Sequence, residues 1–125
     1  MTTEGRGAAT SIAERLRAAL VPAMRSRETA AVSAIRSAMA AISNAEAVPT
    51  PELDTRAGSG PIAGAVGVGA AETARRELTE DDRVAIVTEE VRERDAAADE
   101  LTLAGQPEAA ERLRAESAAL RRLLG

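Results

Sequence analysis

The stretch from Gly58 to Ala70, GSGPIAGAVGVGA, contains five glycines and one proline in an otherwise helix-forming chain. Glycine-rich turns can bind phosphate, because their backbone amides approach an anion closely. The Walker A loop also needs a lysine after its last glycine, and the sequence contains no lysine. The dinucleotide fingerprint Gly-x-Gly-x-x-Gly fails as well, because Gly64 comes one place late after Gly58 and Gly60 and no strand pattern precedes it. The sequence therefore favours an irregular connection between helices over a nucleotide-binding site.

Two interpretations of this stretch stay open. One is a flexible linker. The other is a short apolar turn that packs on the helices, since apolar residues are unusual in a pure linker. That turn would use Ile62, Val66 and Val68.

Three carboxylates, Glu89, Glu90 and Glu93, fall within one helical turn and could bind a divalent cation. A di-iron bundle would need Glu-x-x-His pairs, and the sequence has no histidine. We interpret the carboxylates as a solvated acidic face. An enzyme that uses the face of Glu89 and Glu93 with a cation is the alternative.

The amino-terminal half contains the only locally basic zone of a chain whose net charge is −4. Arginine side chains in such a zone can contact a phosphate backbone, and two of them fall at an expected hairpin turn. The chain has no aromatic residue to stack on a base, which argues against readout of single strands by stacking. Arginines on an exposed helix are otherwise simply solubilising. The candidate nucleic-acid-binding residues are Arg15, Arg17, Arg25, Arg27 and Arg36.

Few other residue types that act in catalysis are present, because the sequence lacks histidine, cysteine, lysine and tyrosine. We therefore expect no catalytic residue, no cofactor and no metal site. No apolar run approaches the roughly 18 to 20 residues that cross a bilayer, and the amino terminus does not have the layout of a secretion signal. We expect a cytoplasmic protein that binds neither membrane nor DNA.

The spacing of apolar residues predicts four amphipathic helices. The first begins at Ser11, whose pairing with Glu14 is a capping box, and Pro22 should kink it or end it early. The second runs from about Glu28 to Ala47, after a short turn. The expected apolar seams are Ile12, Leu16, Leu20 and Met24 in the first helix and Val32, Ile35, Met39 and Ile42 in the second.

The carboxyl-terminal half predicts the other two helices. Thr79 is a good N-cap for a helix of roughly 25 residues, with Asp82 at the capping-box position. Gly105 should end that helix and Pro107 should start the last one. The expected seams are Val84, Val87, Val91, Ala98 and Leu101 in the third helix and Ala110, Leu113, Ser117, Leu120 and Leu124 in the fourth.

These elements predict an all-α fold of two antiparallel helical hairpins joined by a long Gly/Pro-rich connector. Residues 1–10 are expected to be a disordered terminus, and residues 11–125 a single domain in which residues 48–75 form the connector. Thirty of the apolar residues are alanine, so the core must be thin and self-association could supplement it.

Several segments, taken in order, resemble the GatB/YqeY family. They are Ile35-Arg36, residues 40–46, residues 76–82, residues 90–94, Ala104-Gly105-Gln106 and residues 109–116. The resemblance covers residues 11–48 and 75–124, and that family is similar to the tail of the GatB subunit of the glutamine-dependent Asp/Glu-tRNA amidotransferase. It implies an all-α fold and a role in holding tRNA or associating with an amidotransferase complex, without a catalytic centre of its own. A carbon–nitrogen ligase activity with glutamine as amido donor belongs to the whole complex.

The chain departs from the family in three ways. Family members usually continue into a second small helical bundle after the segment matching residues 120–124, and their connector is shorter than residues 48–75. Gln106 stands where arginine is common. The alternative function is therefore a helical protein-interaction module, as a homodimer or with another partner, that does not bind RNA.

Overall fold

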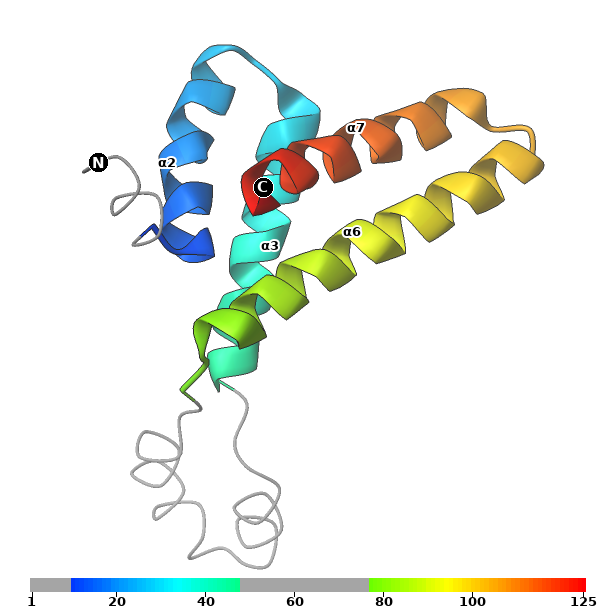
Figure 1. Ribbon diagram of the computed structural model, residues 1–125. Helices are drawn as coiled ribbons and strands as arrows, with labels where there is room; N and C mark the ends of the chain where they lie inside the picture. Colours follow the sequence, from blue (N-terminus) through cyan, green and yellow to red (C-terminus); the bar gives the residue numbers. More distant parts are fainter. Residues whose placement is uncertain (1–9, 48–76) are drawn as a thin grey trace, which may run out of the picture. The chain divides into compact units, whose positions relative to one another are not determined.

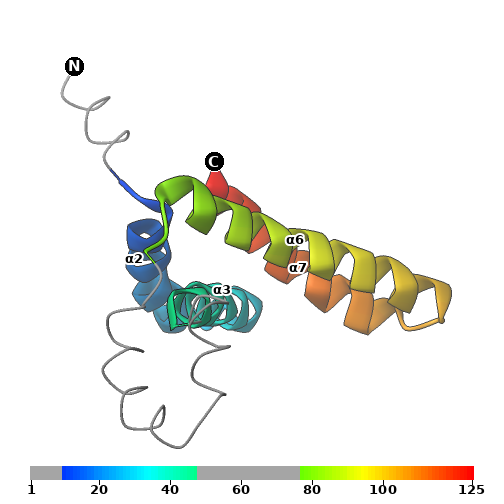
Figure 2. The same cartoon turned by 90° about the horizontal axis from the view of Figure 1, so that it is seen from below.

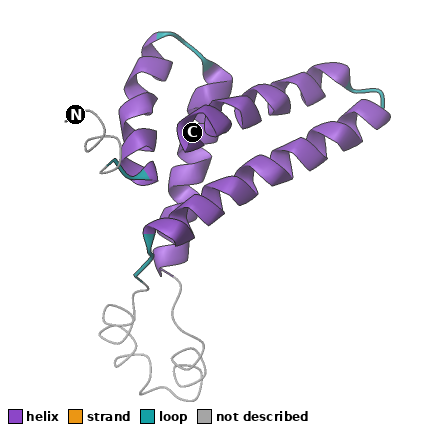
Figure 3. Ribbon diagram, in the orientation of Figure 1, coloured by secondary structure: helices purple, strands orange, loops and turns teal. Residues whose placement is uncertain are grey.

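A computed structural model describes residues 10–47 and 77–125. These residues form four α-helices and no strand, which confirms the all-α prediction for the described part (Figures 1 and 3). The helices are α2 (Ile12–Arg25), α3 (Thr29–Ala47), α6 (Glu80–Leu103) and α7 (Pro107–Leu124). The glycine-rich stretch, the expected connector and all but the last residue of the expected disordered terminus lie outside the described residues.

The chain divides into two units, Met1–Ile42 with Thr79–Gly125, and Ser43–Leu78. The described part of the first unit contains α2, α3 as far as Ile42, α6 and α7. The described part of the second unit contains the end of α3 and the two residues before Thr79. The contacts that join α2, α6 and α7 lie within the first unit.

The predicted capping boxes are both present. The Ser11 hydroxyl accepts a hydrogen bond from the Glu14 amide at 3.1 Å, and the Glu14 carboxylate accepts one from the Ser11 amide. Thr79 and Asp82 make the same pair of bonds at 3.0 Å each. Each box satisfies two amide donors that have no partner inside the helix, and so fixes where α2 and α6 begin.

Pro22 neither ends nor interrupts α2, which continues to Arg25. Proline cannot donate a hydrogen bond to the carbonyl four residues earlier, here that of Ala18. Both Pro22 and Ala18 are exposed, so water can satisfy that carbonyl. The expectation of an early end to the helix is therefore wrong, because the lost bond lies on the solvent side.

Both hairpin turns use the same helix-ending motif. In the α6–α7 turn, the Gln106 amide donates to the Leu101 carbonyl at 2.8 Å, and Gly105 adopts the left-handed conformation with φ of 77°. In the α2–α3 turn, the Glu28 amide donates to the Ala23 carbonyl at 3.0 Å, and Arg27 takes the left-handed position with φ of 58°. This pattern is a Schellman motif, whose left-handed residue is usually glycine. An arginine there is strained by about 1 kcal/mol.

The apolar seams are confirmed in part. Ile12, Leu16, Ile35 and Leu120 are buried, but Met24 is 47% exposed and Ala23 is buried in its place. An α-helix has 3.6 residues per turn, so a stripe spaced by four rotates by about 40° each turn and leaves the buried face by its fourth member. The expectation that Met24 lies in the core is wrong for this reason. The other expected seam residues that lie at the edge of the core, half-buried, are Leu20, Val32, Met39, Val84, Leu101, Leu113 and Leu124.

Small residues fill much of the remaining core. Buried alanines line α3 at positions 31, 34 and 38, and others lie in α6 and α7. Alanine lets helices approach closely but removes little apolar surface from water. The core therefore depends on a few large side chains.

Two hydrogen bonds tie α2 to the second hairpin. The Ile12 amide, at the start of α2, donates to the Glu80 carboxylate at 2.8 Å. The Arg15 guanidinium donates to the Leu123 carbonyl at 2.7 Å, near the end of α7. The negative Glu80 carboxylate lies at the amino-terminal end of α2, where the helix dipole is positive. The positive Arg15 guanidinium lies at the carboxyl-terminal end of α7, where the dipole is negative, so both contacts are favourable. None of the described helices is both long enough and apolar enough to cross a membrane.

Candidate functional site

The five arginines of the predicted nucleic-acid-binding zone do not form one group. Arg15 is half-buried, and its guanidinium is bound to the Leu123 carbonyl of α7. Its Nε atom is buried without a hydrogen-bond partner among the described residues. In this structure Arg15 therefore holds α2 against the end of α7, apart from the exposed arginines of the zone.

Arg17, Arg25, Arg27 and Arg36 are all exposed. None of them forms an ion pair with any described residue. Arg17 lies seven residues before Met24 and thus on the same face of α2. We call these four residues the basic rim.

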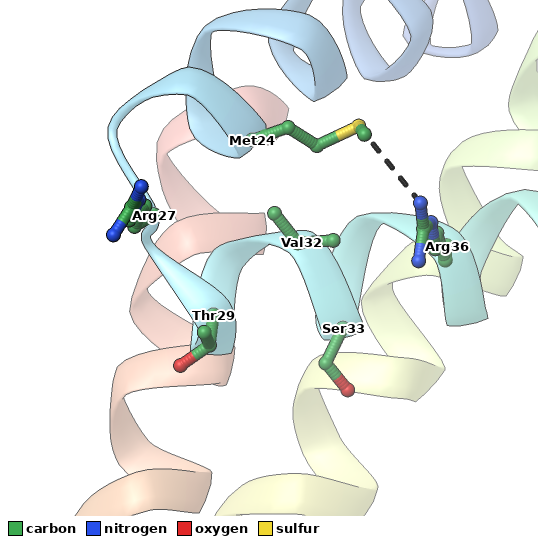
Figure 4. A pocket seen from close by; sticks show the side chains of 6 residues that line it. All are labelled: Met24, Arg27, Thr29, Val32, Ser33 and Arg36. Carbon is green, nitrogen blue, oxygen red and sulfur yellow. Dashed lines mark hydrogen bonds between the residues drawn. The ribbon is translucent and has the colours of Figure 1, made fainter.

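An open cavity of about 640 Å³ lies between the end of α2 and the start of α3 (Figure 4). Met24 extends across it toward Arg36, whose Nη2 atom lies 3.8 Å from the Met24 sulfur, and Val32 lies between them on α3. We call this cavity the α2–α3 groove. Its lining residues are Met24, Arg27, Thr29, Val32, Ser33 and Arg36.

The groove combines an apolar floor with a cationic edge. Met24 is 47% exposed, and Val21, one turn before it on α2, is 51% exposed. Two of the four residues of the basic rim, Arg27 and Arg36, line the groove itself. Such an arrangement suits a ligand that has an apolar centre and negative charges around it.

Charge is distributed unequally over the first unit. Residues 10–42 contain five arginines and two glutamates, which gives +3, and residues 79–125 contain seven arginines and twelve acidic residues, which gives −5. The first hairpin can therefore attract an anionic partner that the second hairpin repels.

The acidic residues of α6 do not all face solvent. Glu89 and Glu93 are exposed, as expected for a solvated face. Glu90 is only 16% exposed, and its carboxylate accepts hydrogen bonds from Arg94 and from the Ser37 hydroxyl of α3, both at 2.8 Å. The interpretation as a solvated face is thus wrong for Glu90, because its position on the helix points it toward α3.

Arg94 is the centre of a buried charge cluster. Its side chain is 14% exposed and binds Glu90 on α6 and Glu116 on α7, each at 2.8 Å; the Glu116 side chain is 8% exposed. Burial lowers the pKa of Arg94, but the hydrogen bonds to Glu116 and Glu90 and their negative charges outweigh burial and leave the pKa raised. The cluster joins α3, α6 and α7, and we assign it a structural role.

A second polar contact lies farther along the same helix pair. The Ser117 hydroxyl, which is fully buried, donates to the Asp95 carboxylate at 2.7 Å, and Arg121 also binds Asp95. The described residues contain no group of three or more acidic side chains arranged to hold a metal ion. The geometry therefore offers no support for a cation at Glu89 and Glu93.

The surface formed by the basic rim and the α2–α3 groove could be predicted only in part from the sequence. The arginines stand out as the basic zone, but nothing in residue type marks Val21 and Met24 as exposed. For Met24, the signal is the drift of a four-residue spacing away from the buried face.

No known family model matches the chain, and no significant match was found among curated proteins or solved structures. The surface chemistry of the chain is therefore the basis for any functional assignment.

Proposed function

We propose that the chain is a cytoplasmic, non-catalytic accessory protein that binds tRNA through the basic rim, in the manner that its resemblance to the GatB/YqeY family implies. It would serve glutamine-dependent aminoacyl-tRNA amidation by holding tRNA for an amidotransferase complex. The observation that carries the proposal is a set of four exposed arginines on one hairpin that form no ion pair with any described residue.

The arrangement of the rim supports phosphate contact in particular. Guanidinium groups bind phosphate oxygens in a bidentate manner, and an unpaired arginine gives up no ion pair when it does so. The rim runs from α2 through the turn at Arg27 to Arg36 on α3, while the acidic second hairpin limits contact with RNA to this side. Without aromatic side chains, recognition would follow backbone shape more than base sequence.

Titration into labelled bulk tRNA at two salt concentrations tests this function. Four phosphate contacts should make the affinity fall about a hundredfold between about 50 and 200 mM salt. Replacing Arg25 and Arg27 together by alanine should weaken tRNA binding at low salt. It should also reduce the salt slope, that is, the slope of log affinity against log salt concentration, by about half. The matched control replaces the exposed arginines Arg92 and Arg112 of the second hairpin, and should change neither.

A single substitution separates charge from stability at the turn. Arg27→Gly removes one charge but relieves the left-handed strain, so the free energy of unfolding should stay equal or rise by up to about 1 kcal/mol. The same variant should bind tRNA more weakly, with a salt slope lower by about one. Thermal unfolding and the tRNA titration check both results on one protein. Unchanged tRNA affinity would remove Arg27 from the binding surface.

The α2–α3 groove favours a second candidate function, a helical protein-interaction module that does not bind RNA. The observation behind it is the exposure of Met24, which lines the groove with Val32, and of Val21 one turn earlier on α2, since a phosphate backbone makes no use of apolar side chains. A folded protein that fails to bind tRNA even at low salt would exclude the RNA function and leave this one.

A further inference from the structure

We propose that the α2–α3 groove binds the α6–α7 tip of a second copy of the same chain, with Leu103 of the tip inserted between Met24 and Val32. By the α6–α7 tip we mean residues 99–111. The inference deepens the second candidate function and rests on it, because it names the partner of the groove. It is independent of tRNA binding, although it uses part of the basic rim.

The tip carries the most exposed large apolar side chain among the described residues. Leu103 is 88% exposed at the last position of α6, immediately before the turn. A leucine on a helix end that packs against nothing contributes no stability to its own fold, and its exposure to water is unfavourable. The large exposed apolar residues of the described part are Leu103, Val21 and Met24, and one interface would cover all three.

Charge complementarity supports the same pairing. The tip contains four acidic residues and no basic one, whereas residues 17–36 contain four arginines and one glutamate. Among the acids of the tip, Glu100, Glu108 and Glu111 are exposed and form no ion pair with any described residue. A leucine surrounded by carboxylates matches an apolar floor edged by guanidinium groups.

The groove cannot receive the tip of its own chain. Glu80, at the start of α6, is hydrogen-bonded to Ile12 at the start of α2. Leu103 lies 23 residues farther along a continuous helix, about 35 Å away, whereas α2 extends only about 20 Å. Figures 1 and 2 show the α6–α7 turn at the end of the second hairpin remote from α2. The tip is therefore available to another copy, either by mutual exchange in a closed dimer or by head-to-tail addition.

The expected result is a solution mass that rises with concentration above the 12.9 kDa of one chain. A contact of this size is weak, so light scattering or sedimentation should cover about 10 µM to 1 mM. Leu103→Ala should raise the dissociation constant about tenfold or more, because it removes most of the buried apolar surface of the tip. Because Leu103 is exposed, the Leu103→Ala variant should fold like the wild type, and circular dichroism measures its helix content.

Methyl spectra locate the contact. The chain has three methionines, Met1, Met24 and Met39. With ¹³C-labelled methionine methyl groups, the Met24 signal should move with protein concentration, while the half-buried Met39 signal should not. In Leu103→Ala, the Met24 signal should stay at its dilute position over the same concentrations.

Two charge-reversed variants give a stronger test. The first, with Arg27→Glu and Arg36→Glu, makes the groove acidic. The second, with Glu100→Arg, Glu108→Arg and Glu111→Arg, leaves Asp99 as the tip's one acid beside three arginines and so makes the tip basic. Each variant alone brings like charges together and should remain a monomer. Their mixture restores an opposite-charge pairing at both contacts, so it should associate again.

A mass of one chain at every concentration overturns self-association, as does a mixture of the two variants that stays monomeric while wild type associates. These results do not decide the broader functions, which have separate readouts. Binding of tRNA is measured with protein dilute enough to be monomeric. An acidic, leucine-containing helical peptide of another sequence can be added to the monomeric protein. If it shifts the Met24 signal, the chain is an interaction module whose partner is not a second copy.

Discussion

Replacing Arg94 by methionine is expected to lower the free energy of unfolding by about 3 kcal/mol. Among the described residues, the substitution removes the one positive charge that Glu116 and Glu90 share, and leaves two carboxylates largely buried at the junction of α3, α6 and α7. Glu116 then keeps only a 3.8 Å ion pair with the exposed Arg112, and Glu90 only the Ser37 hydroxyl. Breaking a buried ion pair from one side is strongly destabilising, because the remaining charge stays without compensation. Urea unfolding followed by circular dichroism measures the change.

Two further variants identify the cause of this loss. Adding Glu90→Gln and Glu116→Gln to Arg94→Met removes the uncompensated charges and should recover most of the lost stability. Arg92→Met, at a position whose side chain is 73% exposed, breaks only a surface ion pair and should change stability by less than about 0.5 kcal/mol. Equal effects of Arg94→Met and Arg92→Met would contradict the structural role of the cluster.

The pH dependence of the Arg94 contribution follows from the direction of its pKa shift. A group whose pKa is raised on folding contributes stability that is full below its pKa in the unfolded chain and is lost as the pH rises through its folded pKa. For arginine, both values lie at strongly alkaline pH. Arg94 therefore stays charged throughout the neutral range and contributes no pH dependence there.

Leu120→Ala is the second substitution with a large expected effect, a loss of about 3 kcal/mol of unfolding free energy. Leu120 is fully buried on α7. Among the described residues, the other largest fully buried side chains are those of Ile12, Leu16, Ile35, Val87 and Ser117. Truncation removes apolar contacts and leaves a cavity, which for leucine costs about 2 to 5 kcal/mol. Many of the buried core residues of this unit are alanine, whose side chain is too short to fill such a space.

The same substitution at an exposed site is the matched control. Leu103→Ala, at 88% exposure, should change the stability of the monomer by less than about 0.5 kcal/mol in thermal or urea unfolding. Similar losses at positions 103 and 120 would mean that burial does not govern stability in this chain. Both measurements belong at low protein concentration, so that association does not add to stability.

The helices could be predicted from the sequence because their signals are local. Ser11 with Glu14, Thr79 with Asp82, and Gly105 before Pro107 each act within a few residues, and each appears as expected. Local hydrogen bonds of this kind depend only on residues a few positions apart, so no knowledge of the neighbouring helices is needed.

The contacts between helices could not be predicted in the same way. Glu90 and Glu93 are equivalent by residue type, and only the position of α3 decides that one is buried and the other exposed. Arg15 belongs by spacing to the basic zone, yet the end of α7 takes its guanidinium. The exposure of Met24 follows from the rotation of a helix relative to a partner that the sequence does not specify.

The sequence separation of these contacts has a consequence for the order in which the fold assembles. Hydrogen bonds between α6 and α7 join residues 12 to 26 positions apart, whereas the bonds from Ile12 and Arg15 join residues 68 and 108 positions apart. Closing a longer loop costs more chain entropy before any contact can compensate for it, and long-range contacts generally slow folding. We therefore expect the α6–α7 hairpin to form before α2 docks on it. The helix that carries Arg17 and Arg25 of the basic rim would then join the second hairpin late in folding.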